Sequence, residues 1–175
     1  MGCIFQTDNI NIMFYLFLTP SFAAVVFDTF VFDVEKLTLN GTSHVAKFDN
    51  ETLYYNYMGP VARPSECTRG SDTVAVTIAE DYEDEDRMKC YPHGMLNTVK
   101  HSLIQDKPFH LPKGIRTTYD NGSEMGAPLV FEILCSRIDR KTVKRFAAFD
   151  YRVTWYHPAG CPRPNIMKPS RFDRI

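Results

Sequence analysis

The segments that decide the fold are Cys90-Tyr91-Pro92-His93, Phe131-Glu132-Ile133-Leu134-Cys135 and Asp150-Tyr151-Arg152-Val153. Each is short, rich in apolar or aromatic residues and typical of a β-strand. An antiparallel register that places His93 opposite Glu132 also places Cys90 opposite Cys135, because both pairs of residue numbers have the same sum. His93 and Cys90 are an odd number of residues apart, so the two pairs lie on opposite faces. One strand pairing therefore aligns a His–Glu pair and a Cys–Cys pair.

The strands predicted at 129–136 and 146–156 alternate between apolar and polar side chains. The apolar sets are Phe131, Ile133 and Cys135 in the first strand, and Phe149, Tyr151, Val153 and Trp155 in the second. This pattern is typical of an antiparallel sheet with one buried and one wet face. Glu132 and Arg152 are therefore expected on the wet face, where Tyr91 and His93 have the parity to join them.

A helix is predicted upstream of these strands, from Ser71 or Asp72 to about Asp86. Either of the first two residues can cap it. Its apolar face is formed by Val74, Ala75, Ile78, Ala79 and Tyr82. The predicted fold class is therefore α+β, with one helix packed on a central antiparallel β-sheet.

The rest of the chain divides around this main domain, which covers residues 65–161. Asn40-Gly41 is a hairpin turn signal between 37–39 and 44–48, so residues 24–64 are expected to be an N-terminal extension with a β hairpin. Residues 94–127 look rich in loops. The last segment, 162–175, is a basic tail that contains proline.

The N-terminal residues 1–23 are predicted to be a signal peptide. The apolar run 12–18 is followed by Ser21-Phe22-Ala23, which has the small residues of a cleavage site. The run is too short to span a bilayer. Residues 1–11 carry no Lys or Arg, so Met13 is an alternative start, and Met1-Gly2-Cys3 is an alternative lipidation-type start.

Sequons and cysteines also favour secretion. Three Asn-x-Ser/Thr sequons predict glycosylation at Asn40, Asn50 and Asn121. The strand register favours a Cys90–Cys135 disulfide, which leaves Cys67–Cys161 to close a long loop. Free thiols in a cytosolic protein are the alternative. The cysteines lack the spacing of a zinc site, so no metal is expected.

A His, a Glu and an Arg on neighbouring strands would suit transphosphorylation of RNA. Glu132, alone or with His93, would remove the 2′-OH proton, and Arg152 would stabilise the phosphoryl charge. The alternative is a Glu132–Arg152 ion pair on a solvated sheet. A basic cluster between the two strands would hold RNA phosphates or form a solvated hairpin tip. Its members are Arg137, Arg140, Lys141, Lys144 and Arg145.

Residues 65–161 resemble the fungal guanyl-specific ribonucleases, and more closely the RNase-like secreted effectors of powdery mildew fungi. The resemblance is carried by Tyr91-Pro92-His93, Phe131-Glu132-Ile133 and Asp150-Tyr151-Arg152-Val153, with a Cys before the predicted helix and a late Cys. It implies a microbial ribonuclease-like fold. It also implies the following roles: Glu132 as catalytic carboxylate, His93 as its assistant, Arg152 and Tyr91 as phosphate contacts, and Asn97 as a residue of the guanine loop.

Two departures from the family pattern change the functional expectation. The region 164–169, where the family has its general-acid His, contains none, and Val99 stands where the guanine-reading Glu is expected. We therefore expect a secreted, monomeric effector without catalytic activity, acting by binding host RNA or host protein, with delivery into host cells as one destination. No cofactor and no stable membrane insertion are expected. The alternatives are an active ribonuclease that uses His157 or His101 as the acid, and a disulfide-bonded binding module unrelated to RNA.

Overall fold

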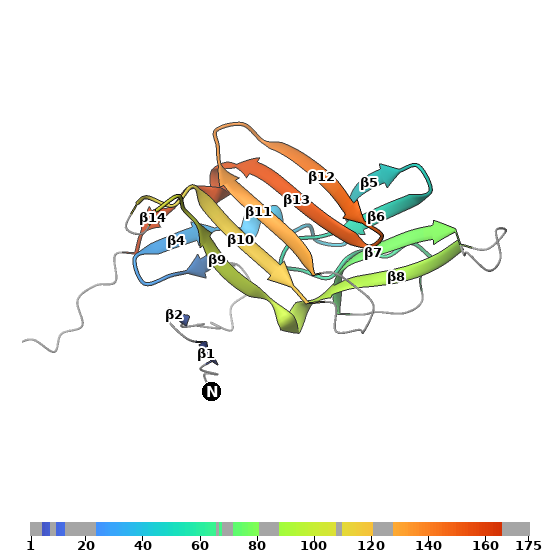
Figure 1. Cartoon of the computed structure of the whole chain (residues 1–175), viewed down its shortest axis with the longest axis horizontal. Coiled ribbons are helices and arrows are strands. Elements are labelled where there is room, and N and C mark those ends of the chain that lie inside the picture. Colours follow the sequence, from blue (N-terminus) through green and yellow to red (C-terminus); the bar gives the residue numbers. More distant parts are fainter. Residues whose placement is uncertain are drawn as a thin grey trace, which may run out of the picture.

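The chain folds into two packed β-sheets, seen in a computed structural model that describes residues 5–7, 10–12, 24–65, 67, 72–80, 88–107, 110–120 and 128–165 (Figure 1). The five-stranded sheet has the order β12-β13-β11-β10-β9, and the four-stranded sheet has the order β5-β6-β7-β8. The strands of the first are β9 (Lys100–Ile104), β10 (Gly114–Tyr119), β11 (Leu129–Cys135), β12 (Arg140–Ala147) and β13 (Asp150–His157). The strands of the second are β5 (His44–Phe48), β6 (Glu51–Tyr55), β7 (Thr73–Glu80) and β8 (Met88–Met95).

Smaller elements complete the described part of the chain. A three-stranded sheet of order β14-β4-β3 joins β3 (Ala24–Val26) and β4 (Phe30–Asp33) to β14 (Arg163–Pro164). β1 (Phe5–Thr7) pairs with β2 (Ile10–Ile12). The 3-10 turns are η1 (Glu35–Leu37), η2 (Leu96–Thr98) and η3 (Pro158–Gly160).

The predicted α+β fold is wrong, because the described residues contain no α-helix and the first half of the predicted helix is strand β7. β7 is buried from Thr73 to Ala79 on both of its faces. Thr77 points toward β13, whereas Val76 and Ile78 pack on the opposite face against Val61. A run in which apolar residues occupy both faces satisfies helical spacing as well as strand spacing. The remainder of that predicted helix, 81–87, lies outside the described residues.

The core lies between the two large sheets and is rich in aromatic residues. Phe131 of β11 is completely buried, and its ring centroid lies 6.1 Å from Tyr55, 5.3 Å from Tyr57 and 5.9 Å from Tyr119. In both β11 and β13 buried residues alternate with more exposed ones, as the sequence predicts. The two sheets therefore form a β-sandwich around one hydrophobic cluster.

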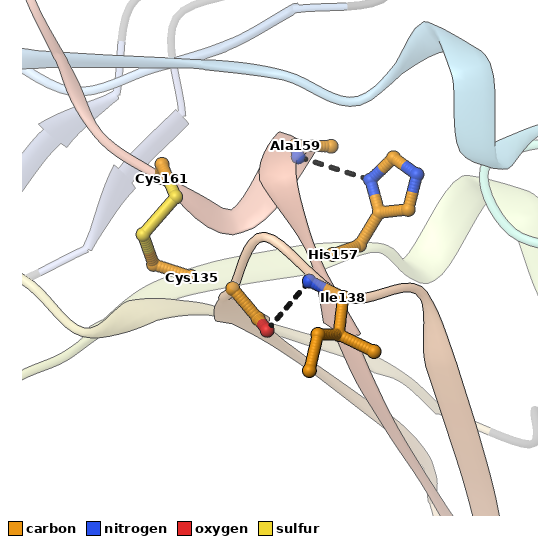
Figure 2. Close-up of a disulfide and its surroundings, with 6 residues drawn as sticks. Cys135, Ile138, His157, Ala159 and Cys161 are labelled. Atoms are coloured by element: carbon orange, nitrogen blue, oxygen red, sulfur yellow. Dashed lines mark hydrogen bonds between the residues drawn. A yellow bond between two sulfur atoms is a disulfide. The ribbon is translucent and has the colours of Figure 1, made fainter.

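The predicted disulfide pairing is also wrong, because the structure joins Cys67 to Cys90 and Cys135 to Cys161. Cys90 lies on β8 opposite Ile78, and Cys135 ends β11 in the other sheet, so the two thiols do not meet. Cys67 brings its segment over the outer face of β7. Figure 2 shows the second disulfide, which ties the end of β11 to the chain after η3.

The β hairpin predicted in residues 24–64 exists, but with another turn and another role. Its strands are β5 and β6, which pair from His44↔Tyr55 to Phe48↔Glu51, so the turn is not at Asn40-Gly41. β6 also pairs with β7 and contributes Leu53 and Tyr55 to the core. The hairpin is therefore half of the four-stranded sheet rather than an extension.

Only parts of the two predicted terminal segments belong to the residues that the structure describes. Of the predicted signal peptide, residues 1–4, 8–9 and 13–23 lie outside them, and so do Asn121 and residues 166–175. In the predicted tail, Arg163 and Pro164 pair with Val31 and Phe30 of β4.

Candidate binding site

His93 of β8 lies between the two sheets and not on a wet face. It pairs with Ala75 of β7, and only 3% of its surface is exposed. Its Nε2 lies 2.8 Å from Thr77 Oγ1, and its ring centroid lies 5.5 Å from that of Tyr151. Burial lowers the pKa of His93 to about 4. The imidazole is therefore a neutral core group at neutral pH.

Glu132 and Arg152 share the outer face of the five-stranded sheet, as predicted, but do not pair with each other. β11 and β13 run parallel, and Glu132 is opposite Thr154. The Glu132 carboxylate instead accepts from Arg116 on β10, with Nη2 at 2.8 Å from Oε1. The sheet separates both residues from His93, because Tyr151, which contacts His93, alternates with Arg152 along β13. The predicted catalytic group is thus not assembled.

The remaining predicted catalytic residues are also dispersed. Tyr91 packs on Phe149, with ring centroids 4.5 Å apart. His101 of β9 is buried, and its Nδ1 lies 2.9 Å from Thr117 Oγ1. His157 ends β13, where its Nδ1 accepts from the amide of Ala159, beside the second disulfide (Figure 2). Each of these groups already has a structural partner.

The predicted basic cluster falls mainly on β12, a strand that the sequence reading treated as a connection. β12 is an edge strand of the five-stranded sheet, and eight residues form it. From the register with β13, Arg140 and Lys144 lie on the outer face beside Tyr156 and Arg152. Lys141 and Arg145 lie on the inner side, next to the buried positions of β13.

The two other members of the predicted RNA-binding set lie off this strand. Arg137 is exposed in the turn before β12. Asn97 is exposed in η2, which leads into β9 at the opposite edge of the same sheet. The structure therefore does not bring Asn97 to the basic strand.

On the outer face of the five-stranded sheet, cations away from β12 and β13 form ion pairs with carboxylates. Lys100 pairs with Asp120 at 2.8 Å, and Arg116 pairs with Glu132. In contrast, Arg140, Lys144 and Arg152 form no ion pair with any carboxylate of the described residues. The Arg140 guanidinium lies 4.6 Å from the Tyr156 ring centroid and that of Arg152 lies 5.0 Å from the Phe146 ring centroid. Lys144 stands directly opposite Arg152, so two like charges face each other.

On the inner side, Lys141 lies in a groove between the edge strands of the two sheets. The groove has a volume of about 370 Å³ and is lined by His44, Val45, Ala46, Lys47, Phe48, Tyr55, Lys141 and Val143. Lys141 Nζ donates to His44 Nδ1 at 3.1 Å, because an ammonium group has no lone pair to accept with. It also lies 4.3 Å from the Trp155 ring centroid. Burial lowers the pKa of Lys141, and the pKa of His44 falls to about 4 through burial and the nearby Lys141 charge.

Arg145 connects β12 to the interior through a chain of polar groups. Its Nε lies 3.0 Å from Oε1 of the buried Glu51. The Tyr151 hydroxyl donates to the same oxygen at 2.8 Å and accepts from Thr77 at 3.1 Å. These contacts join β12, β6, β13 and β7, so they hold the basic strand in place against the four-stranded sheet. The sequence reading missed Glu51 and His44, because contacts across about 100 residues leave no local pattern.

Other kinds of site receive no support from the described residues. Within them, no group of three His, Cys, Asp or Glu side chains is arranged to hold a metal ion. Among the same residues, none belongs to a helix with the length and apolar character needed to cross a membrane.

The chain was compared with known proteins. Neither a protein-family model nor a curated protein matches the chain. Among solved structures, chicken IGF2R domain 11 is similar at 13% sequence identity, over 75% of this chain and 84% of that chain, with a TM-score of 0.47. A similarity this distant carries no conclusion about function.

Proposed function

We propose that this chain is a disulfide-bonded binding module that takes an acidic protein partner on β12 and the adjoining part of β13. The observation that carries the proposal is the set of cations there. Four of the eight β12 residues are basic and none is acidic. Arg140, Lys144 and Arg152 have no carboxylate partner among the described residues, and Lys144 faces Arg152. An acidic partner would relieve this repulsion.

The distribution of the cations favours a protein partner over RNA. An RNA strand lying on the flat outer face would reach Arg140, Lys144 and Arg152, but not Lys141 on the inner side. The cations farther along that face, Arg116 and Lys100, are already neutralised. Phosphate contacts would therefore be few, and affinity for RNA grows with the number of phosphates contacted.

A ribonuclease activity finds less support in the geometry. His93 is buried between the two sheets, whereas Glu132 lies on the outer face of the five-stranded sheet. The Glu132 carboxylate already accepts a hydrogen bond from Arg116. General acid–base catalysis needs both groups within hydrogen-bond reach of one substrate. We also propose that the chain is secreted. The two disulfides and the exposed sequon residues Asn40 and Asn50 support this proposal. We further propose that the acidic partner is a protein of a host.

A direct comparison of two polyanions tests the proposed function. Fluorescence anisotropy would measure binding of labelled poly-L-glutamate and of oligouridylate with the same number of charges, at several salt concentrations. We expect tighter binding of poly-L-glutamate. The double variant Arg140→Glu/Lys144→Glu should weaken it about tenfold, because two exposed attractions become repulsions. Lys36→Glu/Lys107→Glu, which changes the net charge by the same amount at two exposed lysines away from β12, is the matched control and should have little effect.

Three results would count against the proposal. Tighter binding of oligouridylate would favour a nucleic-acid partner. Equal loss of affinity in the β12 double variant and in the Lys36→Glu/Lys107→Glu control would show that net charge, not the β12 site, drives association. Cleavage of the oligouridylate that disappears in Glu132→Gln would revive the ribonuclease alternative.

A further inference from the structure

We propose that the acidic partner binds as an added β-strand along the free edge of β12, and that it carries two pairs of acidic residues separated by two β-branched residues. This inference rests on the proposed function. It specifies how the acidic partner binds and which sequence pattern the partner carries. An edge strand presents backbone N–H and C=O groups that no neighbouring strand occupies. β12 is such a strand, since its single neighbour in the sheet is β13.

The pattern of the partner follows from the order of residues in β12. Cations occupy the pairs Arg140-Lys141 and Lys144-Arg145, with Thr142-Val143 between them. Successive side chains point to opposite faces, so each face of the strand has two cations four residues apart. A strand added in the plane of the sheet has neighbours on both faces. It would therefore place acids opposite all four cations and β-branched side chains opposite Thr142 and Val143.

The pattern acid-acid-x-x-acid-acid reads the same in both directions. It therefore suits a parallel or an antiparallel partner equally well. Arg145 already gives its Nε to Glu51, but its terminal N–H groups remain available to a second carboxylate.

The groove beside β12 gives room for the inner side chains of the added strand. Lys141 and Val143, the inner residues at the centre of β12, line the groove together with residues of β5. An acidic side chain entering there would meet Lys141, which contacts His44 and the Trp155 ring and lies within the electrostatic influence of Asp139. At the two ends of the strand, Ile138 and Phe146 are exposed by 70% and 58%, and would flank the added segment.

A second copy of this chain is a poor occupant of the same edge. Antiparallel pairing of β12 with itself about Val143, near its centre, would place Lys141 opposite Arg145 and Arg140 opposite Phe146. Lys141 and Arg145 of each copy would then face cations, which destabilises strand pairing, and no acid of the strand would face Arg140 or Lys144. Charged edges of this kind keep proteins from joining edge to edge. The charge of β12 therefore selects an acidic strand and rejects its own copy.

The test uses a synthetic peptide, acetyl-Asp-Glu-Val-Thr-Glu-Asp-amide, and a permuted peptide, acetyl-Asp-Val-Glu-Glu-Thr-Asp-amide, with the same composition. Calorimetry would compare their affinities for the full chain. Two further peptides carry N-methyl groups on alternate amides, so that one removes the N–H groups facing β12 and the other removes those facing solvent. We expect the first peptide to bind more tightly than the permuted one. One N-methylated peptide should lose roughly tenfold in affinity and the other should lose little.

Variants of the chain give a second readout. Thr142→Pro and Val143→Pro each remove one backbone N–H, and only one of the two N–H groups points away from β13. The variant that keeps its fold, judged by circular dichroism, should lose peptide affinity. Equal affinity of the two acidic peptides, or equal effects of the two N-methylations, would overturn strand addition. If Arg140→Glu/Lys144→Glu still weakened peptide binding in that case, the proposed function would stand without strand addition. If this double variant bound the peptide as tightly as the native chain, both the proposed function and strand addition would fail.

Discussion

Acid should destabilise this protein in a pH range where most carboxylates are still charged. His93 and His101 are 3% and 6% exposed, and burial lowers the pKa of each to about 4. In the unfolded chain both should titrate near 6.5. The unfolded state therefore binds more protons between these values, so the free energy of unfolding is fully present above pH 6.5 and falls as the pH drops toward 4.

The size of the effect follows from the two pKa values. Between pH 7 and pH 5, a histidine whose pKa moves from 6.5 to 4 lowers the free energy of unfolding by about 2 kcal/mol. His93 and His101 together lower it by about 4 kcal/mol, which is a large part of the 5–15 kcal/mol typical of a domain. His44 shifts in the same direction, but it is partly exposed, and solvent screening makes its share smaller.

Urea denaturation at pH 7, 6 and 5 measures this loss. The matched variant is His93→Gln/His101→Gln, because an amide can keep a hydrogen bond to Thr77 and to Thr117 without titrating. We expect the native chain to lose about 4 kcal/mol over this range and the variant to lose much less. A native chain with the same free energy of unfolding at pH 7 and pH 5 would refute the reasoning. A variant with an undiminished pH dependence would refute it too.

Three other variants test the packing and the second disulfide of the sandwich. Tyr151→Phe leaves Glu51 and Thr77 without their shared partner and should lower the free energy of unfolding by about 1–3 kcal/mol in urea titrations; an unchanged midpoint would contradict the buried contact. Gly114→Ala should cost about 2 kcal/mol in thermal melts, because the new Cβ would collide with the Ile133 carbonyl oxygen; a neutral result would mean that the two strands are farther apart. Replacing both Cys135 and Cys161 by Ala should cost about 3.5 kcal/mol from the lost loop closure across 26 residues, and peptide mapping without reductant would detect the disulfide directly.

The sequence predicts strands β11 and β13 well because both have one buried and one exposed face. In such strands the alternation of apolar and polar residues records burial directly, as in Tyr151, Arg152 and Val153. The same alternation does not identify β7. This strand is buried on both faces, so its apolar residues do not repeat with a period of two. Its β-branched residues, Val74, Val76 and Ile78, were the signal that favours a strand.

The pairing of strands is less accessible to sequence reasoning than their existence. His93 and Glu132 can be aligned by number, but β8 belongs to the other sheet, and β11 pairs with β10 and β13 instead. β9 and β10 were hidden in a stretch that looked rich in loops. The wrong pairing also gave the wrong disulfides, and it made residues on two sides of a sheet look like one catalytic group.

The basic cluster shows what a one-dimensional pattern can and cannot indicate. The sequence identifies the cations between β11 and β13 as a possible binding surface. It does not reveal that they form an edge strand, or that Lys141 and Arg145 turn inward while Arg140 and Lys144 turn outward. That division favours an added strand over a flat polyanion.

Hydrogen exchange of the β12 amides, measured by NMR with and without the peptide acetyl-Asp-Glu-Val-Thr-Glu-Asp-amide, tests the central claim most directly. In the free chain, alternate amides from Arg140 to Arg145, where the register with β13 is regular, should be protected by β13 and the others should exchange quickly. Saturation with the peptide should protect the fast set, since these N–H groups would donate to the added strand. Binding that leaves the fast amides unprotected would contradict strand addition at this edge.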